Sequence, residues 1–133
     1  MVDNSNPPNM IGIDAQVSTD GVGTLTSPAF SSTTNSDLLV AFVALDGLSN
    51  SPQTATVSGA GLTWTLLKRS NTQAGDAEFW AAKATDFLTN ATVITQPSVG
   101  SDDHGSLVVL AFANAAGPGI VVPAAVPSGA PDI

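Results

Sequence analysis

Leu38-Leu39-Val40-Ala41-Phe42-Val43-Ala44-Leu45 is apolar at every position, and the turn signal Asp46-Gly47 follows it directly. Periodicity alone does not separate a helix from a strand in such a run. Its length of eight residues, its branched side chains and its turn-forming flanks favour a strand that is buried on both faces. We therefore predict a central strand of a β-sheet over residues 38–45.

Other strand patterns lie on both sides of this run. Residues 107–113 form a second wholly apolar run, and residues 62–66 alternate, which places Leu62, Trp64 and Leu66 on one face. Shorter patterns cover residues 10–17, 23–26, 54–58, 77–84 and 91–95. A reversal is expected at Asp20-Gly21, and residues 76–87 are rich enough in alanine to leave a helical alternative. Together these patterns predict an all-β fold, an antiparallel β-sandwich of jelly-roll or immunoglobulin-like type with about eight short strands.

The length of 133 residues is typical of one domain. Residues 1–9 contain two prolines and no apolar periodicity, so we expect a flexible leader there. The sandwich is expected over residues 10–122, with residues 120–122 able to add a short edge strand. Residues 123–133 are rich in proline and glycine and are expected to form a tail or linker.

Charge and composition exclude several classes of function. Eleven acidic residues against Lys68, Arg69 and Lys83 give a net charge of −8, which disfavours nucleic acid and anionic membranes as partners. The apolar runs are far shorter than the ~20 residues of a membrane-spanning helix. Cysteine is absent, which excludes disulfides and thiolate sites. The N-terminal residues form no signal peptide, but the low charged fraction of 11% favours an extracellular or cell-surface location.

Four stretches carry a resemblance to a known class of module: residues 36–43, 57–66, 77–82 and 106–114. They resemble accessory β-sandwich modules, jelly-roll or immunoglobulin-like, of secreted multidomain bacterial proteins. The resemblance covers residues 10–116, rests on strand and turn patterns, and includes no catalytic motif. Such modules continue with further strands after a segment resembling Ser128-Gly129-Ala130-Pro131. The resemblance thus implies a non-catalytic module whose sheet is completed by another strand, another chain or a second copy.

Aromatic side chains on a sandwich face can stack on sugar rings, and the candidates are Trp80, Phe79 and Trp64. Phe79 and Trp80 are adjacent on a predicted strand, so one of them must point away from the core. The leading functional hypothesis is therefore a polysaccharide-binding module. The alternative is a structural, adhesive or self-assembling module that contacts a neighbouring protein module or forms a homo-oligomer.

Polar residues offer few catalytic or metal-binding candidates. His104 is the only histidine and has no nucleophile-elbow motif around it, so no catalytic residue is predicted and we expect no enzymatic activity. Asp102 and Asp103 could bind a structural calcium ion, although no EF-hand spacing accompanies them. Solvated surface aspartates are the simpler interpretation, and no other cofactor is expected.

Glu78 is the only glutamate of the chain. Its position predicts that it lies on the Trp80 face of its strand or at the margin of that face, where it could pair with Lys68 or Lys83. A buried lysine near a carboxyl group is also an ingredient of a spontaneous isopeptide bond. Lys83 and Glu78 are therefore candidates for such a cross-link.

Overall fold

The computed structural model of the chain describes residues 10–47, 52–72, 74–99 and 103–119. The regular structure in these ranges consists of eight strands: β1 (Gly12–Val22), β2 (Leu25–Thr26), β3 (Leu38–Leu45), β4 (Ala55–Gly59), β5 (Thr65–Ser70), β6 (Asp76–Lys83), β7 (Val93–Pro97) and β8 (His104–Ala113). The prediction of an all-β chain with about eight strands is confirmed. The helical alternative for residues 76–87 is wrong, because β6 and an irregular segment occupy this range.

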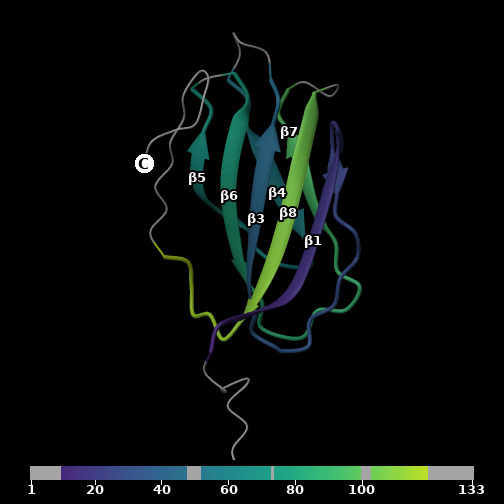
Figure 1. The fold of residues 1–133 in the computed structure, drawn as a ribbon, viewed down its shortest axis with the longest axis vertical. Helices are drawn as coiled ribbons and strands as arrows, with labels where there is room; N and C mark the ends of the chain where they lie inside the picture. Colours follow the sequence, from purple (N-terminus) through teal and green to yellow (C-terminus); the bar gives the residue numbers. More distant parts are fainter. Residues whose placement is uncertain (1–9, 48–51, 73, 100–102, 120–133) are drawn as a thin grey trace, which may run out of the picture.

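A five-stranded antiparallel sheet forms one layer of the molecule, with the strand order β1-β8-β3-β6-β5 (Figure 1). β3 lies at its centre and pairs with β8 on one side and β6 on the other over its full length. The prediction that residues 38–45 form a central strand is confirmed. The strand is buried at all positions except Phe42 and Ala44, which are exposed.

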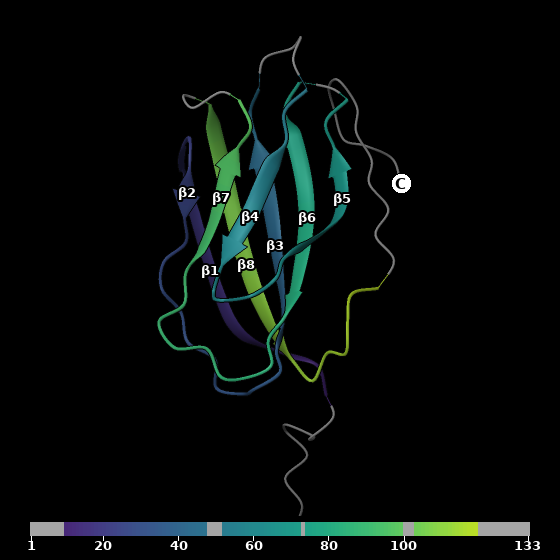
Figure 2. The ribbon, with the colours of Figure 1, turned by 180° about the vertical axis from the view of Figure 1, so that it is seen from behind.

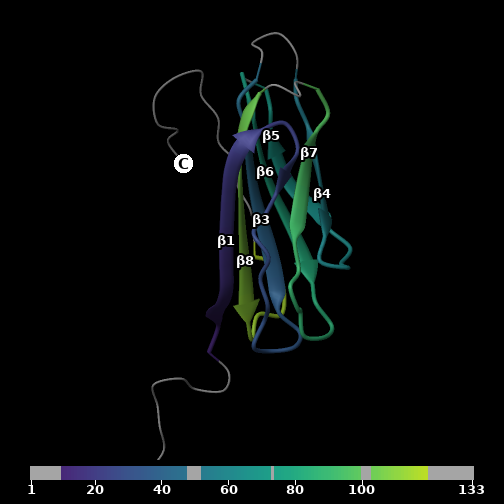
Figure 3. The same ribbon diagram turned by 90° about the vertical axis from the view of Figure 1, so that its right-hand side faces the viewer.

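The second layer is a three-stranded sheet with the order β2-β7-β4. Figure 2 shows this sheet in front of the larger one, and Figure 3 shows the two layers from the side. We call the face of the five-stranded sheet that meets the smaller sheet its inner face, and the opposite side its outer face. The arrangement is a β-sandwich in which one sheet is wider than the other.

The main core lies between the two sheets. Its buried members are Leu25, Phe30, Leu39, Ala41, Val43, Leu45, Ala55, Val57, Ala84, Leu88, Val93, Leu107, Val109 and Ala111. A second apolar cluster lies on the outer face, where Leu38, Val40, Ala81 and Ala115 are buried beneath the half-buried Leu67, Phe79, Leu110 and Phe112. The large sheet is therefore apolar on both faces, which is unusual for a sheet with one face turned to solvent.

The first chain reversal differs from the expected one. Asp20 and Gly21 pair with Ser106 and Gly105 inside the β1–β8 ladder, so the predicted turn at Asp20-Gly21 is wrong. The ladder hydrogen bonds hold this dipeptide extended. The chain turns instead at Gly23, whose φ of 73° is a backbone conformation that glycine adopts without strain.

Several expectations fall on residues outside the described ranges. They are the flexible leader over residues 1–9, the edge strand over residues 120–122 and the tail over residues 123–133.

Candidate functional site

Both tryptophans pack against the main core and are half-buried. Trp64 Nε1 donates a hydrogen bond to the Gly59 carbonyl at 3.1 Å, and Trp80 Nε1 donates one to Glu78 Oε2 at 2.6 Å. A ligand that used either indole N–H would have to break one of these bonds. The tryptophans therefore offer little polar chemistry to a ligand.

Phe79 points to the opposite face of β6 from Trp80, as adjacent strand residues do. On the outer face it lies beside Phe42 of β3, with ring centroids 4.7 Å apart and ring planes inclined by 44°. Phe42 is 45% exposed, although it belongs to an eight-residue apolar run. Nothing in the sequence singles out Phe42, because a run without alternation carries no signal for its outward-facing positions.

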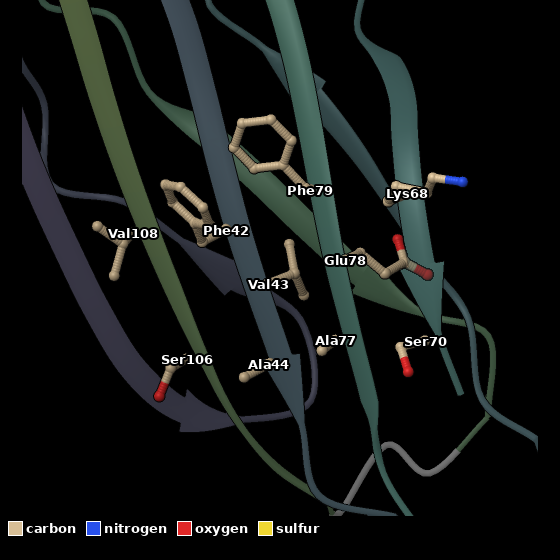
Figure 4. Close-up of a pocket in the computed structure, with 10 residues that line it drawn as sticks. All are labelled: Phe42, Val43, Ala44, Lys68, Ser70, Ala77, Glu78, Phe79, Ser106 and Val108. Atoms are coloured by element: carbon tan, nitrogen blue, oxygen red, sulfur yellow. The ribbon is translucent and has the colours of Figure 1, made fainter. Parts of the chain in front are cut away.

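The two phenylalanine rings line a shallow groove on the outer face, with a volume of about 330 Å³ (Figure 4). Val108, Ala44 and Ala77 contribute to its apolar lining, and Lys68 borders it on β5. An exposed apolar surface of this kind is typical of a contact site for another molecule.

An ion pair between the half-buried Arg69 and the buried Glu78 lies on the inner face, between β5 and β6. Arg69 Nε lies 2.5 Å from Glu78 Oε1, and the Glu78 side chain has no solvent exposure (0%). The same oxygen accepts the Ala55 N–H at 2.9 Å, and Arg69 Nη2 donates to the Ala55 carbonyl at 3.3 Å. The ion pair thereby bonds both backbone polar groups of Ala55 on β4.

This bonding caps an edge of the three-stranded sheet. Within the described residues β4 is the edge strand beside β5 and β6. Besides Ala55, the carbonyl of Gln53 accepts a hydrogen bond from Asn71 Nδ2 at 2.6 Å, and the carbonyl of Gly59 accepts the Trp64 bond. An open edge presents unpaired backbone groups to other strands. Here side chains already occupy such groups at Ala55 and Gly59 of β4 and at Gln53, two residues before the strand.

A second acidic side chain, Asp76, accompanies Glu78 on the inner face of β6. Asp76 is 4% exposed, and neither of its carboxyl oxygens accepts a hydrogen bond from the described residues. Burial, together with the neighbouring Glu78, raises the pKa of Asp76 to about 8. Burial also acts to raise the pKa of Glu78, but hydrogen bonds, above all from Arg69, outweigh it and hold that pKa below its usual value. The pair is therefore one neutral acid beside one carboxylate at neutral pH.

The partner of Glu78 differs from the predicted one because β5 contains a β-bulge. The register shifts between Leu66, which pairs with Trp80, and Lys68, which pairs with Phe79. The extra residue turns Lys68 to the outer face and Arg69 to the inner face, opposite Glu78. The expectation that Glu78 pairs with Lys68 or Lys83 is thus wrong, and its partner is Arg69.

Lys83 lies at the far end of β6 from Glu78. It is exposed, and its Nζ donates to the carbonyls of Ser36 at 2.5 Å and Ala115 at 2.6 Å. The odd spacing of five residues along β6 puts Lys83 and Glu78 on opposite faces of the sheet. The structure therefore does not bring the proposed cross-linking pair together.

His104 is exposed at the start of β8, two residues before Ser106. The Ser106 hydroxyl donates to Asp20 Oδ1 at 2.5 Å. In a Ser-His-Asp triad the serine donates to the histidine, and the aspartate orients that histidine. Ser106, His104 and Asp20 do not form this order of hydrogen bonds.

Of the calcium candidates, Asp102 lies outside the described residues, and the Asp103 carboxylate accepts a hydrogen bond from Gln53 Nε2. No group of three or more acidic, histidine or cysteine side chains that could hold a metal ion occurs in the described ranges. Asp14 and Asp37 form a second acidic pair. Thr33 and Thr34 bond the Asp14 carboxylate, and the Thr34 hydroxyl bonds Asp37, so these carboxylates secure a loop.

The sequence matches no family model, and neither a curated protein nor a solved structure matches it. No helix in the described part of the chain is long and apolar enough to cross a membrane. The features that bear on function are therefore the groove on the outer face and the charge cluster on the inner face.

Proposed function

We propose that this chain is a non-catalytic contact module that binds through the outer face of its five-stranded sheet. The observation that carries this proposal is the aromatic pair of the exposed Phe42 and the half-buried Phe79 at the centre of an apolar groove. Contiguous exposed apolar patches with polar residues at their borders often mark interaction sites. Such a structural or adhesive role also suits the low charged fraction of 11%, which favours an extracellular or cell-surface location.

The tryptophans and the edge of β4 are less available to a partner than the outer face is. The tryptophans are engaged in the core, and side chains already cap β4 at Gln53, Ala55 and Gly59. Pairing of an added strand with β4 would have to displace these caps. The outer face needs no such displacement, because Phe42 is exposed in the folded chain.

The proposal predicts that an apolar dye binds the groove. We expect the fluorescence of 8-anilinonaphthalene-1-sulfonate to rise when the dye is added to the dilute folded chain, and to fall several-fold in Phe42→Ser. The reason is that this substitution removes the most exposed aromatic ring of the groove. Dye titration, with circular dichroism to verify the fold, measures the effect.

Phe87→Ser is the matched control, because Phe87 is 56% exposed but does not line the groove. Its dye binding is expected to equal that of the unmodified chain. Equal dye binding by Phe42→Ser and the unmodified chain would refute the groove as the apolar contact site.

Carbohydrate binding is the second candidate function. It is favoured by the hydroxyl groups of Ser70 and Ser106 at the borders of the groove, which could bond a sugar whose ring stacks on Phe42 or Phe79. If it holds, a soluble polysaccharide should shift the amide NMR signals of β3 and β6, and Phe79→Ala should abolish the shift. If only the contact-module proposal holds, a panel of soluble polysaccharides leaves these signals unchanged.

A further inference from the structure

The outer face of the five-stranded sheet has an apolar centre with opposite charges at its two borders. The strand registers define one row across the sheet, Ser18-Val108-Phe42-Phe79-Lys68, and a neighbouring row, Asp20-Ser106-Ala44-Ala77-Ser70. The three central strands, β8, β3 and β6, supply the apolar residues of both rows. The acidic border lies on β1, and the basic border lies on β5.

Lys68 is the basic side chain that remains available on this face. Arg69 pairs with Glu78, and Lys83 donates to two backbone carbonyls, whereas Lys68 is exposed and has no hydrogen-bond partner among the described residues. Asp20 is the exposed acidic side chain on the opposite border. In a chain with a net charge of −8, a lysine beside an apolar groove marks a place where an acidic partner is favoured.

We propose that the partner of this face is a second copy of the chain, bound face to face about a two-fold axis parallel to β3. Such an axis places Phe42 against Phe42 of the second copy and exchanges the two borders of the sheet. Lys68 of each copy then lies opposite the segment of β1 that holds Ser18 and Asp20 in the other copy. This inference rests on the proposed function, since it names the partner of the same face.

The pattern of apolar and charged residues on the outer face meets the requirement of a symmetric dimer. A two-fold interface uses the same surface on both subunits, so that surface must be complementary to itself. An apolar centre with an acidic border on one side and a basic border on the other meets this requirement, and the Lys68–Asp20 attraction occurs twice. Aromatic residues near the centre of an interface commonly carry most of its binding energy, and here Phe42 has that place.

A small apolar ligand fits the same face less well. Small-molecule sites are concave and hold a few polar groups that orient the ligand. The groove is shallow and mainly apolar, and its charged lysine lies at the border (Figure 4). A flat apolar surface with charged borders is better matched by another flat surface.

Sedimentation equilibrium and light scattering of the full chain test the proposal, at ~0.15 M salt to screen the repulsion between two acidic chains. Between about 1 and 500 µM the average mass is expected to rise toward twice the chain mass of 13.3 kDa. Phe42→Ser is expected to raise the dimer dissociation constant by about 100-fold or more. Phe87→Ser, at an exposed ring away from this face, is expected to leave it unchanged.

Charge reversal tests the predicted register. Lys68→Glu and Asp20→Lys are each expected to weaken the dimer by about ten-fold, because each places like charges opposite each other twice. The combination of both substitutions restores opposite charges and should return the dissociation constant to within about three-fold of the unmodified value. Circular dichroism identifies any variant that loses its fold.

Three results would overturn the inference: a monomer over the whole concentration range, a dimer that tolerates Phe42→Ser, or a double reversal as weak as the single ones. The first result still leaves the contact module in place if dye binding to the dilute chain depends on Phe42. Loss of both the dimer and the Phe42-dependent dye binding would refute the inference and the proposed function together.

Discussion

Replacing Arg69 by methionine is expected to lower the free energy of unfolding by about 3–5 kcal/mol. The substitution keeps the apolar stem of the side chain but removes the charge that lies 2.5 Å from the fully buried Glu78 carboxylate. It also removes the hydrogen bond from Arg69 Nη2 to the Ala55 carbonyl on the edge of β4. An unpaired buried carboxylate is costly, so the effect should far exceed that of losing a surface ion pair. Urea denaturation at neutral pH measures it.

Lys68→Met is the matched control, because Lys68 is adjacent on β5 but exposed on the outer face. In dilute monomeric protein its effect is expected to stay within about 0.5 kcal/mol. If Arg69→Met does not fold, the double variant Arg69→Met with Glu78→Gln still tests the idea. This variant has no buried charge at Glu78 and should be more stable than Arg69→Met alone. Equal loss in the Arg69 and Lys68 variants would contradict the role of the ion pair.

The β-bulge in β5 limits how much of the Arg69–Glu78 site the sequence could predict. The number of strands, their order along the chain and the opposite orientation of Phe79 and Trp80 follow from apolar patterns and turn residues, and the structure agrees with them. The strand predicted over residues 62–66 is displaced, because β5 begins at Thr65 and ends at Ser70. Strict alternation along β5, however, would put Lys68 opposite Glu78. The extra residue in the bulge exchanges Lys68 and Arg69 between the two faces. No local pattern in the sequence marks this shift.

The exposure of Phe42 on the outer face could not be predicted from the sequence either, for a different reason. Residues 38–45 are apolar throughout, so their sequence predicts burial but does not separate Phe42, which is exposed, from Val43, which is buried. The difference in exposure arises from sheet packing, because the smaller sheet covers only the inner face of β3. The acidic pair Asp76 and Glu78 has the i, i+2 spacing that places both side chains on one face of a strand. Their burial depends on the opposing sheet, which the spacing alone does not reveal.

Asp76→Asn is expected to stabilise the chain increasingly as the pH rises from about 4 to about 8, by on the order of 3–5 kcal/mol at the upper limit. The folded chain holds a proton on Asp76 up to a pKa of about 8, whereas the unfolded chain releases it near the ordinary pKa of 3.8. Between these two values the folded state binds more protons than the unfolded state, so the unmodified chain loses stability as the pH rises. Asparagine is neutral at every pH, so Asp76→Asn lacks this loss of stability.

Glu78 acts in the opposite direction and in a different pH window. Its pKa is lower in the folded chain than in the unfolded chain, so its contribution is present above the unfolded value of 4.5 and is lost as the pH falls through the folded value. Above about pH 5 the pH dependence of the difference in unfolding free energy between Asp76→Asn and the unmodified chain therefore comes from Asp76 and not from Glu78. Urea denaturation of both proteins from about pH 5 to about pH 9 measures this difference, with Asp86→Asn as the exposed control. Parallel stability curves for Asp76→Asn and the unmodified chain would show that Asp76 is ionised in the fold, with a charge stabilised by a partner other than Glu78.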